Sequence, residues 1–196
     1  MKSVIIVGAS GHGKVVADII QKAGDKVYGF LDDNTELNDT FLGFPILGTI
    51  DCYKEYRDIA EFVIAIGDAG VRNAILQKIQ GVNIYTAIHP TAVISDIDVT
   101  IGKGTVIMAN AVINSGSRIG EFCIINTGAI VVSYASFIYS ISNPCIVGLL
   151  NHTLDPNFSN TLFFLNMTSY LFLFKQYFYF HITLLSISFF HLVKFI

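Results

Sequence analysis

The sequence predicts an α/β domain followed by a hexapeptide β-helix, and three observations carry this prediction. A short apolar run at residues 3–7 leads into the glycine-rich stretch 8–14 and then into a helical pattern of apolar residues. A six-residue period occupies residues 91–131, and the composition changes at about Val132. Two domains in 196 residues agree with the usual size of folding units.

Large aliphatic residues recur at every sixth position of this periodic stretch, and a small or modest residue stands two positions before each. The aliphatic positions are Ile101, Ile107, Ile113, Ile119, Ile125 and Val131. The small positions are Val99, Thr105, Ala111, Ser117, Cys123 and Ala129. A period of six matches neither a helix nor a simple strand, but it is typical of a hexapeptide β-helix. A β-meander is the alternative, although the turn spacing of meanders drifts.

Composition excludes several classes of function. A formal net charge of -3 with 14% charged residues provides no basic face, so nucleic-acid binding has no electrostatic support. Cys52, Cys123 and Cys145 lie far apart without a CxxC pair, which indicates a reducing compartment and argues against disulfides and a zinc site. The first apolar run is too short for a signal-peptide core, so we expect a cytoplasmic protein without a metal.

The first ninety residues are predicted to alternate between strands and helices. Strands are expected at residues 3–7, 26–31, 62–66 and 82–88. Helices are expected after residue 14, where apolar residues recur on one face, and at residues 51–59 and 71–79, with a loop and a short extended piece at 43–50. His89 and Pro90 mark the boundary with the periodic region, and a structural role is favoured for this histidine over catalysis.

The first strand, the glycine turn and the helix together suit a phosphate, because backbone amides and the positive end of a helix point into the turn. A P-loop is disfavoured, since Val15 stands where the magnesium-binding hydroxyl would follow Lys14. A dinucleotide fold, using Gly8, Gly11 and Gly13, stays open. Gly11 is expected to resist substitution, because a turn against a phosphate leaves no space for a Cβ and can require a positive φ.

Acidic residues end the second strand, at Asp32 and Asp33, and Gly67 ends the third. The carboxyl ends of parallel strands are the usual place for ligand contacts in an open α/β sheet. We expect the two aspartates to contribute to ligand binding more than to folding, because strand-end carboxylates have few structural partners. A solvated acidic turn is the alternative.

Four motifs together resemble the bacterial sialic acid O-acetyltransferase and UDP-4-amino-sugar N-acetyltransferase family, the NeuD/PglD-like sugar acetyltransferases. They are GASGHGK at residues 8–14, GFLDD at 29–33, AIGD at 65–68, and IHPTA at 88–92, which leads into hexads that include INTGAIV at 125–131. The resemblance implies a Rossmann-like domain at residues 1–88 that holds a nucleotide-sugar. It also implies a left-handed β-helix, here from residue 89, that forms homotrimers and binds acetyl-CoA between subunits.

The resemblance places substrate contacts on Ser10, Gly11 and His12, on Asp32 and Asp33, and on Gly67. It places the catalytic histidine of the family, which removes a proton from the attacking amine or hydroxyl, just after the GAIV segment. Here Ser133 occupies that place. Serine cannot act as a general base near neutral pH, so we expect no catalytic residue and no activity.

The composition beyond Val131 differs from that of both predicted domains. From residue 132 to 196 the formally charged side chains are Asp155, Lys175 and Lys194, and the hexad is not continued. We expect a truncated β-helix at residues 89–131 and an aberrant apolar tail at 132–196, produced by a disrupted reading frame. A membrane-associated segment at 177–193 is the less favoured alternative.

Three functional hypotheses follow. The leading one is an acetyl-CoA-dependent acetyltransferase of a nucleotide-activated amino sugar or sialic acid in surface-glycan biosynthesis, inactive in this chain, with neither the trimer nor a complete acetyl-CoA site. The second is a non-catalytic nucleotide-sugar-binding module. The third is an NAD(P)-dependent oxidoreductase, which is disfavoured because the chain has no Tyr-x-x-x-Lys pair of short-chain dehydrogenases.

Overall fold

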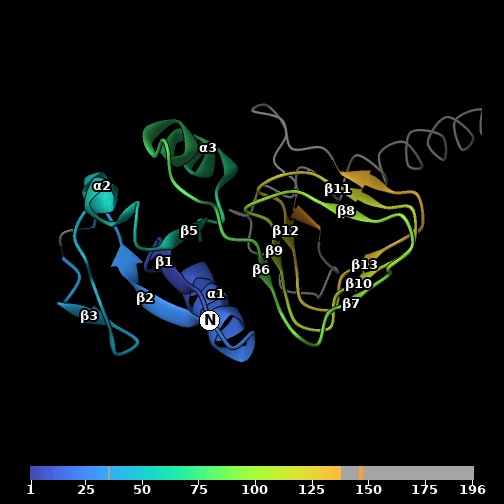
Figure 1. Cartoon of the computed structure of the whole chain (residues 1–196), viewed down its shortest axis with the longest axis horizontal. Helices are drawn as coiled ribbons and strands as arrows, with labels where there is room; N and C mark the ends of the chain where they lie inside the picture. Colours follow the sequence, from blue (N-terminus) through green and yellow to red (C-terminus); the bar gives the residue numbers. More distant parts are fainter. Residues whose placement is uncertain (35, 138–145, 148–196) are drawn as a thin grey trace, which may run out of the picture. The chain divides into compact units, whose positions relative to one another are not determined.

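The first domain is built on a parallel β-sheet. The computed structural model describes residues 1–34, 36–137 and 146–147. Strands β1 (Ser3–Val7), β2 (Lys26–Leu31) and β5 (Glu61–Ile64) pair in the order β2-β1-β5 (Figure 1). Every pairing in this sheet is parallel, which confirms the predicted α/β class.

Successive residues of β1 point to opposite faces of the sheet, and both faces are buried. Val4 and Ile6 pack in one cluster with helix α1 (Gly11–Lys22). Ile5 and Val7 pack on the other face, in a cluster that includes Ile75 of helix α3 (Ala69–Lys78) and its C-cap residue Ile79. A continuous apolar strand is therefore sandwiched between helices.

The connection after β2 is more structured than predicted. Strands β3 (Thr40–Phe41) and β4 (Phe44–Pro45) form a small antiparallel hairpin. The predicted helix at 51–59 is shorter and consists of the 3-10 turn η1 (Ile50–Cys52) and helix α2 (Tyr53–Tyr56). Helix α3 spans Ala69–Lys78, close to its predicted range.

The predicted fourth strand of the sheet at residues 82–88 is wrong. Ile84 makes only an isolated bridge with Phe62. Strand β6 (Ala87–Ile88) pairs instead with β9 (Val106–Ile107) of the periodic region. The amides of Ala87 and His89 donate to the next coil, so the chain pairs with the coils from the third residue after the bridge.

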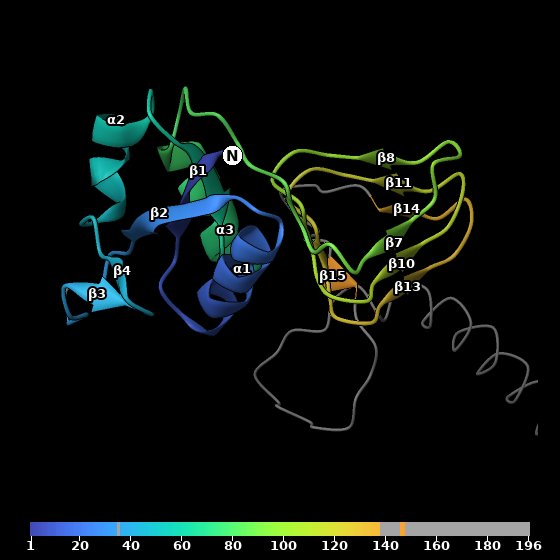
Figure 2. The same cartoon turned by 60° about the horizontal axis from the view of Figure 1, so that its bottom comes forward.

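The periodic region folds into coils that stack as parallel two-residue strands. The described strands form three stacks, β13-β10-β7, β14-β11-β8 and β15-β12-β9-β6, which lie along the three sides of a triangle in Figure 1 and Figure 2. Between residues 100 and 137 paired strands lie eighteen residues apart, as Val112 does from Ile130, whereas Val93 pairs with Val112 at a spacing of nineteen. Three hexads therefore make one coil. The bounds of the remaining strands are β7 (Val93–Ile94), β8 (Thr100–Ile101), β10 (Val112–Ile113), β11 (Arg118–Ile119), β12 (Ile124–Ile125), β13 (Ile130–Val131), β14 (Ser136–Phe137) and β15 (Ile146–Val147).

Both six-residue columns predicted from the sequence are buried between Thr105 and Val131, whereas their first members, Val99 and Ile101, are half-buried. Ile107, Ile113 and Ile125 are at most 1% exposed. Thr105 and Ser117 of the small column are fully buried, and each hydroxyl donates to a backbone carbonyl. Polar side chains are tolerated inside because these hydrogen bonds are made.

A second six-residue period governs the corners and was not recognised from the sequence. Left-handed backbone conformations recur at every sixth residue, namely Asp98, Gly104, Asn110, Gly116, Phe122, Gly128 and Tyr134. A Cβ built on Gly104 would overlap the ring of Phe122, eighteen residues later, and one on Gly116 would lie 2.6 Å from the ring of Tyr134. Glycine at these corners makes room for an aromatic ring of the next coil.

Backbone pairing continues beyond Val131, the last predicted hexad corner. β14 pairs with β11 at the eighteen-residue spacing, whereas β15 pairs with β12 at a spacing of twenty-two residues, from Ile124 to Ile146. Strand pairing uses main-chain groups, so it does not require the interior isoleucine. The other expectations for residues 138–196, including the membrane-associated segment, lie outside the described residues. No helix within the described ranges is long and apolar enough to cross a membrane.

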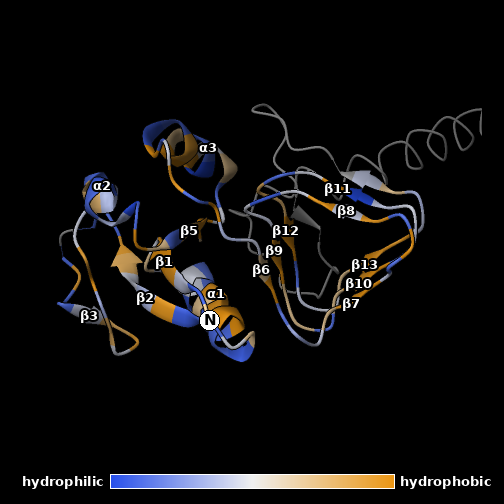
Figure 3. Ribbon diagram, in the orientation of Figure 1, coloured by the Kyte–Doolittle hydropathy of each residue, from blue (hydrophilic) through white to orange (hydrophobic). Residues whose placement is uncertain are grey.

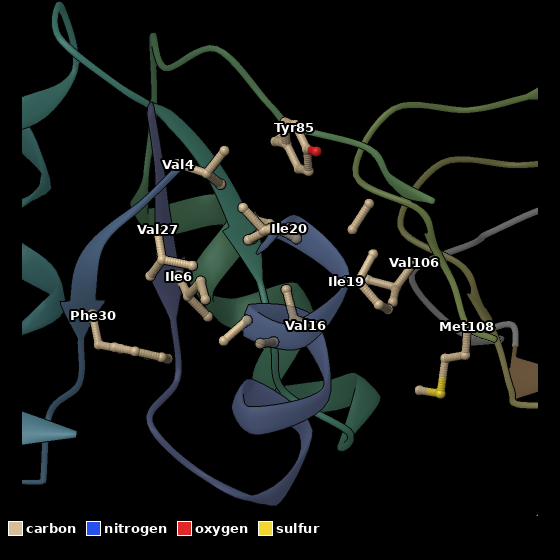
Figure 4. Packing of buried hydrophobic residues seen from close by; sticks show 14 of the residues in the cluster. Val4, Ile6, Val16, Ile19, Ile20, Val27, Phe30, Tyr85, Val106 and Met108 are labelled. Atoms are coloured by element: carbon tan, nitrogen blue, oxygen red, sulfur yellow. The ribbon is translucent and has the colours of Figure 1, made fainter. Parts of the chain in front are cut away.

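Helix α1 joins the sheet to the coils through one hydrophobic cluster. Val16, Ile19 and Ile20 of α1 belong to the same buried cluster as Val106 and Met108 of the coils (Figure 4). Apolar segments face one another at this position in Figure 3. The α/β domain therefore shares part of its core with the first coils.

Ile107→Ala should lower the free energy of unfolding by roughly 2 to 5 kcal/mol, because it empties a fully buried corner. The matched control is Ile97→Ala, since Ile97 is 72% exposed and its truncation should change stability by less than about 0.5 kcal/mol. Denaturant unfolding of both variants measures the difference. Equal effects would show that the six-residue column does not form the interior.

Candidate functional site

The glycine turn after β1 has two tight glycines. Gly8 has a φ of +112°, and a Cβ there would lie 2.9 Å from the carbonyl oxygen of Ala65. A Cβ on Gly13 would overlap the carbonyl oxygen of Gly8. A Cβ on Gly11 would meet nothing within 4 Å, and its φ is not positive. The expectation of a positive φ at Gly11 is therefore wrong, and the close approach within the protein is between Gly13 and the strand end, whereas crowding of Gly11 by a bound phosphate stays a prediction.

Ser10 and His12 lie at the start of α1. Ser10 is exposed and holds the N-cap position without a side-chain capping hydrogen bond. The amides of the first helical turn have no intrahelical acceptors, and the helix dipole favours an anion there. Gly67, in the loop after β5, likewise has open space where a Cβ would be.

His12 is largely buried beside a buried arginine of α3. Burial, with the nearby charge of Arg72 as a second cause, lowers the pKa of His12 to about 4. Its Nε2 atom has no hydrogen-bond partner among the described residues. His12 is therefore neutral at pH 7 and keeps an uncommitted ring nitrogen.

Arg72 was not recognised from the sequence as part of this region. It is 1% exposed, and its Nη1 donates to the carbonyl oxygens of Ile66 and Gly67 at 2.8 and 3.0 Å. These bonds fix the loop that follows β5. Asp68 caps α3 by accepting from the amide of Val71 at 2.8 Å, so the AIGD stretch forms a strand end and a helix cap.

Asp32 binds the backbone on both sides of the turn. Its Oδ2 accepts from the amide of Ala9 at 2.7 Å, and its Oδ1 accepts from that of Asn34 at 2.8 Å. The first bond ties the end of β2 to the glycine turn after β1. Asp32 is consequently part of the folded framework of the site.

Asp33 is also tied to the framework. Its Oδ1 accepts from the amide of Ile50 at 2.8 Å, and its Oδ2 lies 3.6 Å from Lys78 Nζ. Lys78 Nζ lies 3.1 Å from Asp51 Oδ2, and this contact is the main cause of a raised Lys78 pKa. The expectation that the two aspartates have few structural partners is wrong, since amides left free at the strand ends require acceptors.

A cleft of about 310 Å³ opens beside these carboxylates, at the lower end of the range for small-molecule sites. Gly8, Asp32 and Asp33 line one side, and the face of α3 that carries Val71, Ala74, Ile75 and Lys78 lines the other, together with Ile50 and Ile66. The cleft brings together the two predicted aspartates. The other four predicted contacts, Ser10, Gly11, His12 and Gly67, are not among its lining residues.

Lys78 was also not predicted from the sequence as part of the site. The sequence does predict that Val71, Ile75 and Lys78 share one face of α3, because they are spaced four and three residues apart. No sequence pattern gives the direction in which that face points, because the direction depends on how α3 packs on the sheet.

The position expected for a catalytic histidine lies in the loop between β13 and β14. Ser133 is exposed there, between the exposed side chains of Val132 and Tyr134. Of the two histidines in the described residues, His89 is buried in the first coil. Its Nδ1 accepts from the amide of Thr91 at 3.1 Å, which agrees with the structural role favoured above.

These features define an α/β domain with an acid-lined cleft, joined to stacked parallel coils. Residues 3–79 match the family model described as the PglD N-terminal domain. The chain is 40% identical over 118 residues to the UDP-N-acetylbacillosamine N-acetyltransferase of Bacillus subtilis (strain 168), covering 56% of this chain and 52% of that protein. It thus spans about half the length of that curated relative.

Two solved structures extend the comparison to the coils. A variant of perosamine N-acetyltransferase from Caulobacter crescentus, in complex with CoA and GDP-perosamine, is 35% identical with a TM-score of 0.62, covering 67% of this chain and 63% of that one. The acetyltransferase domain of PglB from Neisseria gonorrhoeae is 32% identical with a TM-score of 0.64, covering 69% and 67%. The chain belongs to the NeuD/PglD-like family of sugar acetyltransferases.

Gly13→Ala should destabilise the fold by roughly 1 to 3 kcal/mol, because the added methyl group overlaps a backbone carbonyl. Gly11→Ala is the control and should shift stability by less than about 1 kcal/mol. Thermal unfolding of both variants checks the assignment. A larger loss for Gly11→Ala would restore Gly11 as the tight glycine.

His12 should make stability depend on pH. Its pKa is about 4 in the folded chain and about 6.5 when unfolded, so acid protonates the unfolded chain first. The free energy of unfolding should keep its full value above pH 6.5, where His12 is neutral in both states. It should fall by roughly 3 kcal/mol as the pH approaches 4. His12→Gln should remove this dependence in denaturant unfolding between pH 6.5 and 4.5. Identical pH slopes for the two proteins would contradict the prediction.

Proposed function

We propose that this chain descends from an acetyl-CoA-dependent acetyltransferase of a nucleotide-activated amino sugar or sialic acid, in bacterial surface-glycan biosynthesis. In this proposal the chain retains the nucleotide-sugar domain and has lost catalysis. Membership of the family supports the reaction class, and the Caulobacter relative was solved with CoA and GDP-perosamine. The cytoplasm, where nucleotide-sugars and acetyl-CoA occur, is the proposed compartment.

The acid-lined cleft is the observation that supports binding of a nucleotide-sugar. Its aliphatic wall suits the face of a flat base, and its carboxylates accept hydrogen bonds from ribose or base donors. The diphosphate would be repelled by two carboxylates, so it belongs beside the start of α1, near Ser10, Gly11 and His12. Gly67 lies next to this region and would let the ligand approach the backbone.

Ser133 carries the proposal that catalysis is lost. Removing a proton from an amine or hydroxyl nucleophile requires a base, and a serine hydroxyl near neutral pH is not one. The neighbours in sequence, Val132 and Tyr134, provide no carboxylate. We therefore assign no catalytic residue to this chain.

We further propose that the stacked coils are the opening part of a left-handed hexapeptide β-helix. The domains would be a Rossmann-like unit at residues 1–88, a partial β-helix at 89–131 and an aberrant tail at 132–196. Interruption of the hexad after Val131 and the apolar composition that follows support a disrupted reading frame. Sequencing the locus in several isolates tests this, because an intact frame that encodes the same tail would overturn it.

We propose that the acetyl-CoA site and the trimer interface are incomplete here, because in the family both depend on later coils of the β-helix. Val93 and Ile130, on the outer side of the stack β13-β10-β7, and Val132 are exposed and apolar. An oligomer would cover such a surface. Without the later coils these side chains would face solvent.

A non-catalytic nucleotide-sugar-binding module is the second candidate, and the same cleft favours it. An NAD(P)-dependent oxidoreductase is the third candidate, and no feature of the described residues favours it over a nucleotide-sugar protein.

The full chain should bind a UDP-4-amino-sugar yet transfer acetyl groups from acetyl-CoA at least about 100-fold more slowly than the Bacillus relative assayed beside it, because the general base is missing. Calorimetric titration and product detection by mass spectrometry give the two readouts. NAD binding without UDP-sugar binding would instead favour the oxidoreductase. Turnover comparable to the relative would show that another residue acts as the base.

A further inference from the structure

The polar side of the cleft contains one carboxylate oxygen that the backbone does not use. Asp32 accepts amides with both oxygens, and Asp33 Oδ1 accepts the amide of Ile50. Among the described residues, the partner of Asp33 Oδ2 is Lys78 Nζ, at 3.6 Å. This separation exceeds a hydrogen bond, so the oxygen retains its capacity to accept one.

Lys78 is held in place by a residue outside the cleft lining. Its Nζ lies 3.1 Å from Asp51 Oδ2, closer than to Asp33. An ammonium group has three donors, and this ion pair engages one of them. Donors therefore remain for a ligand in the cleft, which Lys78 lines.

Asp33 Oδ2 and Lys78 Nζ thus present a neighbouring acceptor and donor in a cleft whose remaining lining, apart from Asp32, is Gly8 and aliphatic side chains. The complementary ligand edge has a donor beside an acceptor. Uracil and guanine carry a ring N–H beside a carbonyl oxygen, whereas cytosine and adenine reverse the order with a ring nitrogen acceptor beside an amino group. With the ribose held in one place, the two orders cannot both match when uracil is compared with cytosine or guanine with adenine.

We propose that Lys78 is a specificity-determining residue, which with Asp33 selects bases that carry a ring N–H beside a carbonyl group, as in uridine and guanosine nucleotides. This inference rests on the proposed nucleotide-sugar function and assigns Lys78 and its Asp51 anchor a role in it. A carboxylate that accepts the ring N–H and an ammonium that donates to the adjacent carbonyl oxygen both make charge-assisted hydrogen bonds, which are stronger than neutral ones. Both charged partners therefore favour this order.

The test compares UDP, GDP, CDP and ADP, which share the diphosphate and differ in the base. Calorimetric titration of the full chain should give dissociation constants for UDP and GDP about tenfold below those for CDP and ADP. Lys78→Met should reduce this ratio to about twofold, because the donor to the carbonyl is removed. Lys78→Arg, which keeps the cation, should retain a preference for UDP and GDP.

Lys22→Met is the matched control, since Lys22 also ends a helix and also pairs with an aspartate, at 2.7 Å from Asp18 Oδ2, but does not line the cleft. It should leave all four dissociation constants unchanged. Thermal unfolding of each variant confirms that the folded fraction is the same. A merely structural lysine would lower affinity for all four nucleotides alike and leave their ratio intact.

The outcomes separate this inference from the proposed function. Binding of all four nucleotides with equal affinity, a preference for CDP and ADP, or an unchanged ratio in Lys78→Met would overturn the role of Lys78 while leaving nucleotide binding in place. If the unmodified chain binds none of the four, the proposed function fails together with the inference.

Discussion

The site is organised by carboxylates that accept backbone amides at the ends of parallel strands. Asp32 bonds to the amide of Ala9 and thereby draws the glycine turn toward the end of β2. Asp33 bonds to the amide of Ile50 and fixes the loop that returns from the hairpin. These buried or half-buried amides require acceptors, so the acidic pair builds the cleft before any ligand enters it. The same groups then determine what the cleft can accept.

Helix α1 connects this site to the coils. Its first turn adjoins the glycine turn, and its apolar face contributes Val16, Ile19 and Ile20 to a core shared with Val106 and Met108. A change in the position of the helix would therefore alter both the ligand site and the packing of the first coils. Shared burial of this kind means that unfolding of either domain exposes apolar surface of the other.

The sequence was informative where a feature is local and periodic. The interior columns of the coils followed from spacing, because burial repeats with the backbone, and β1 followed from a short β-branched run that leads into a glycine turn. Spacing did not distinguish Gly11 from Gly13, since only the packed turn shows which glycine approaches the carbonyl of Gly8. Arg72 and Lys78 were missed for a similar reason. Their partners are carbonyl and carboxylate oxygens that only the folded sheet brings near them.

The corner glycines of the coils have a consequence for how such a sequence can drift. The ring of Phe122 occupies the space that a side chain at position 104 would need, eighteen residues earlier. A side chain at position 104 would therefore require a smaller residue at position 122, and the φ of +71° restricts position 104 further. Among descendants of this sequence, positions 104 and 122 should covary, as should 116 and 134. The length of one coil would then be visible as covariation between residues eighteen positions apart in the sequence.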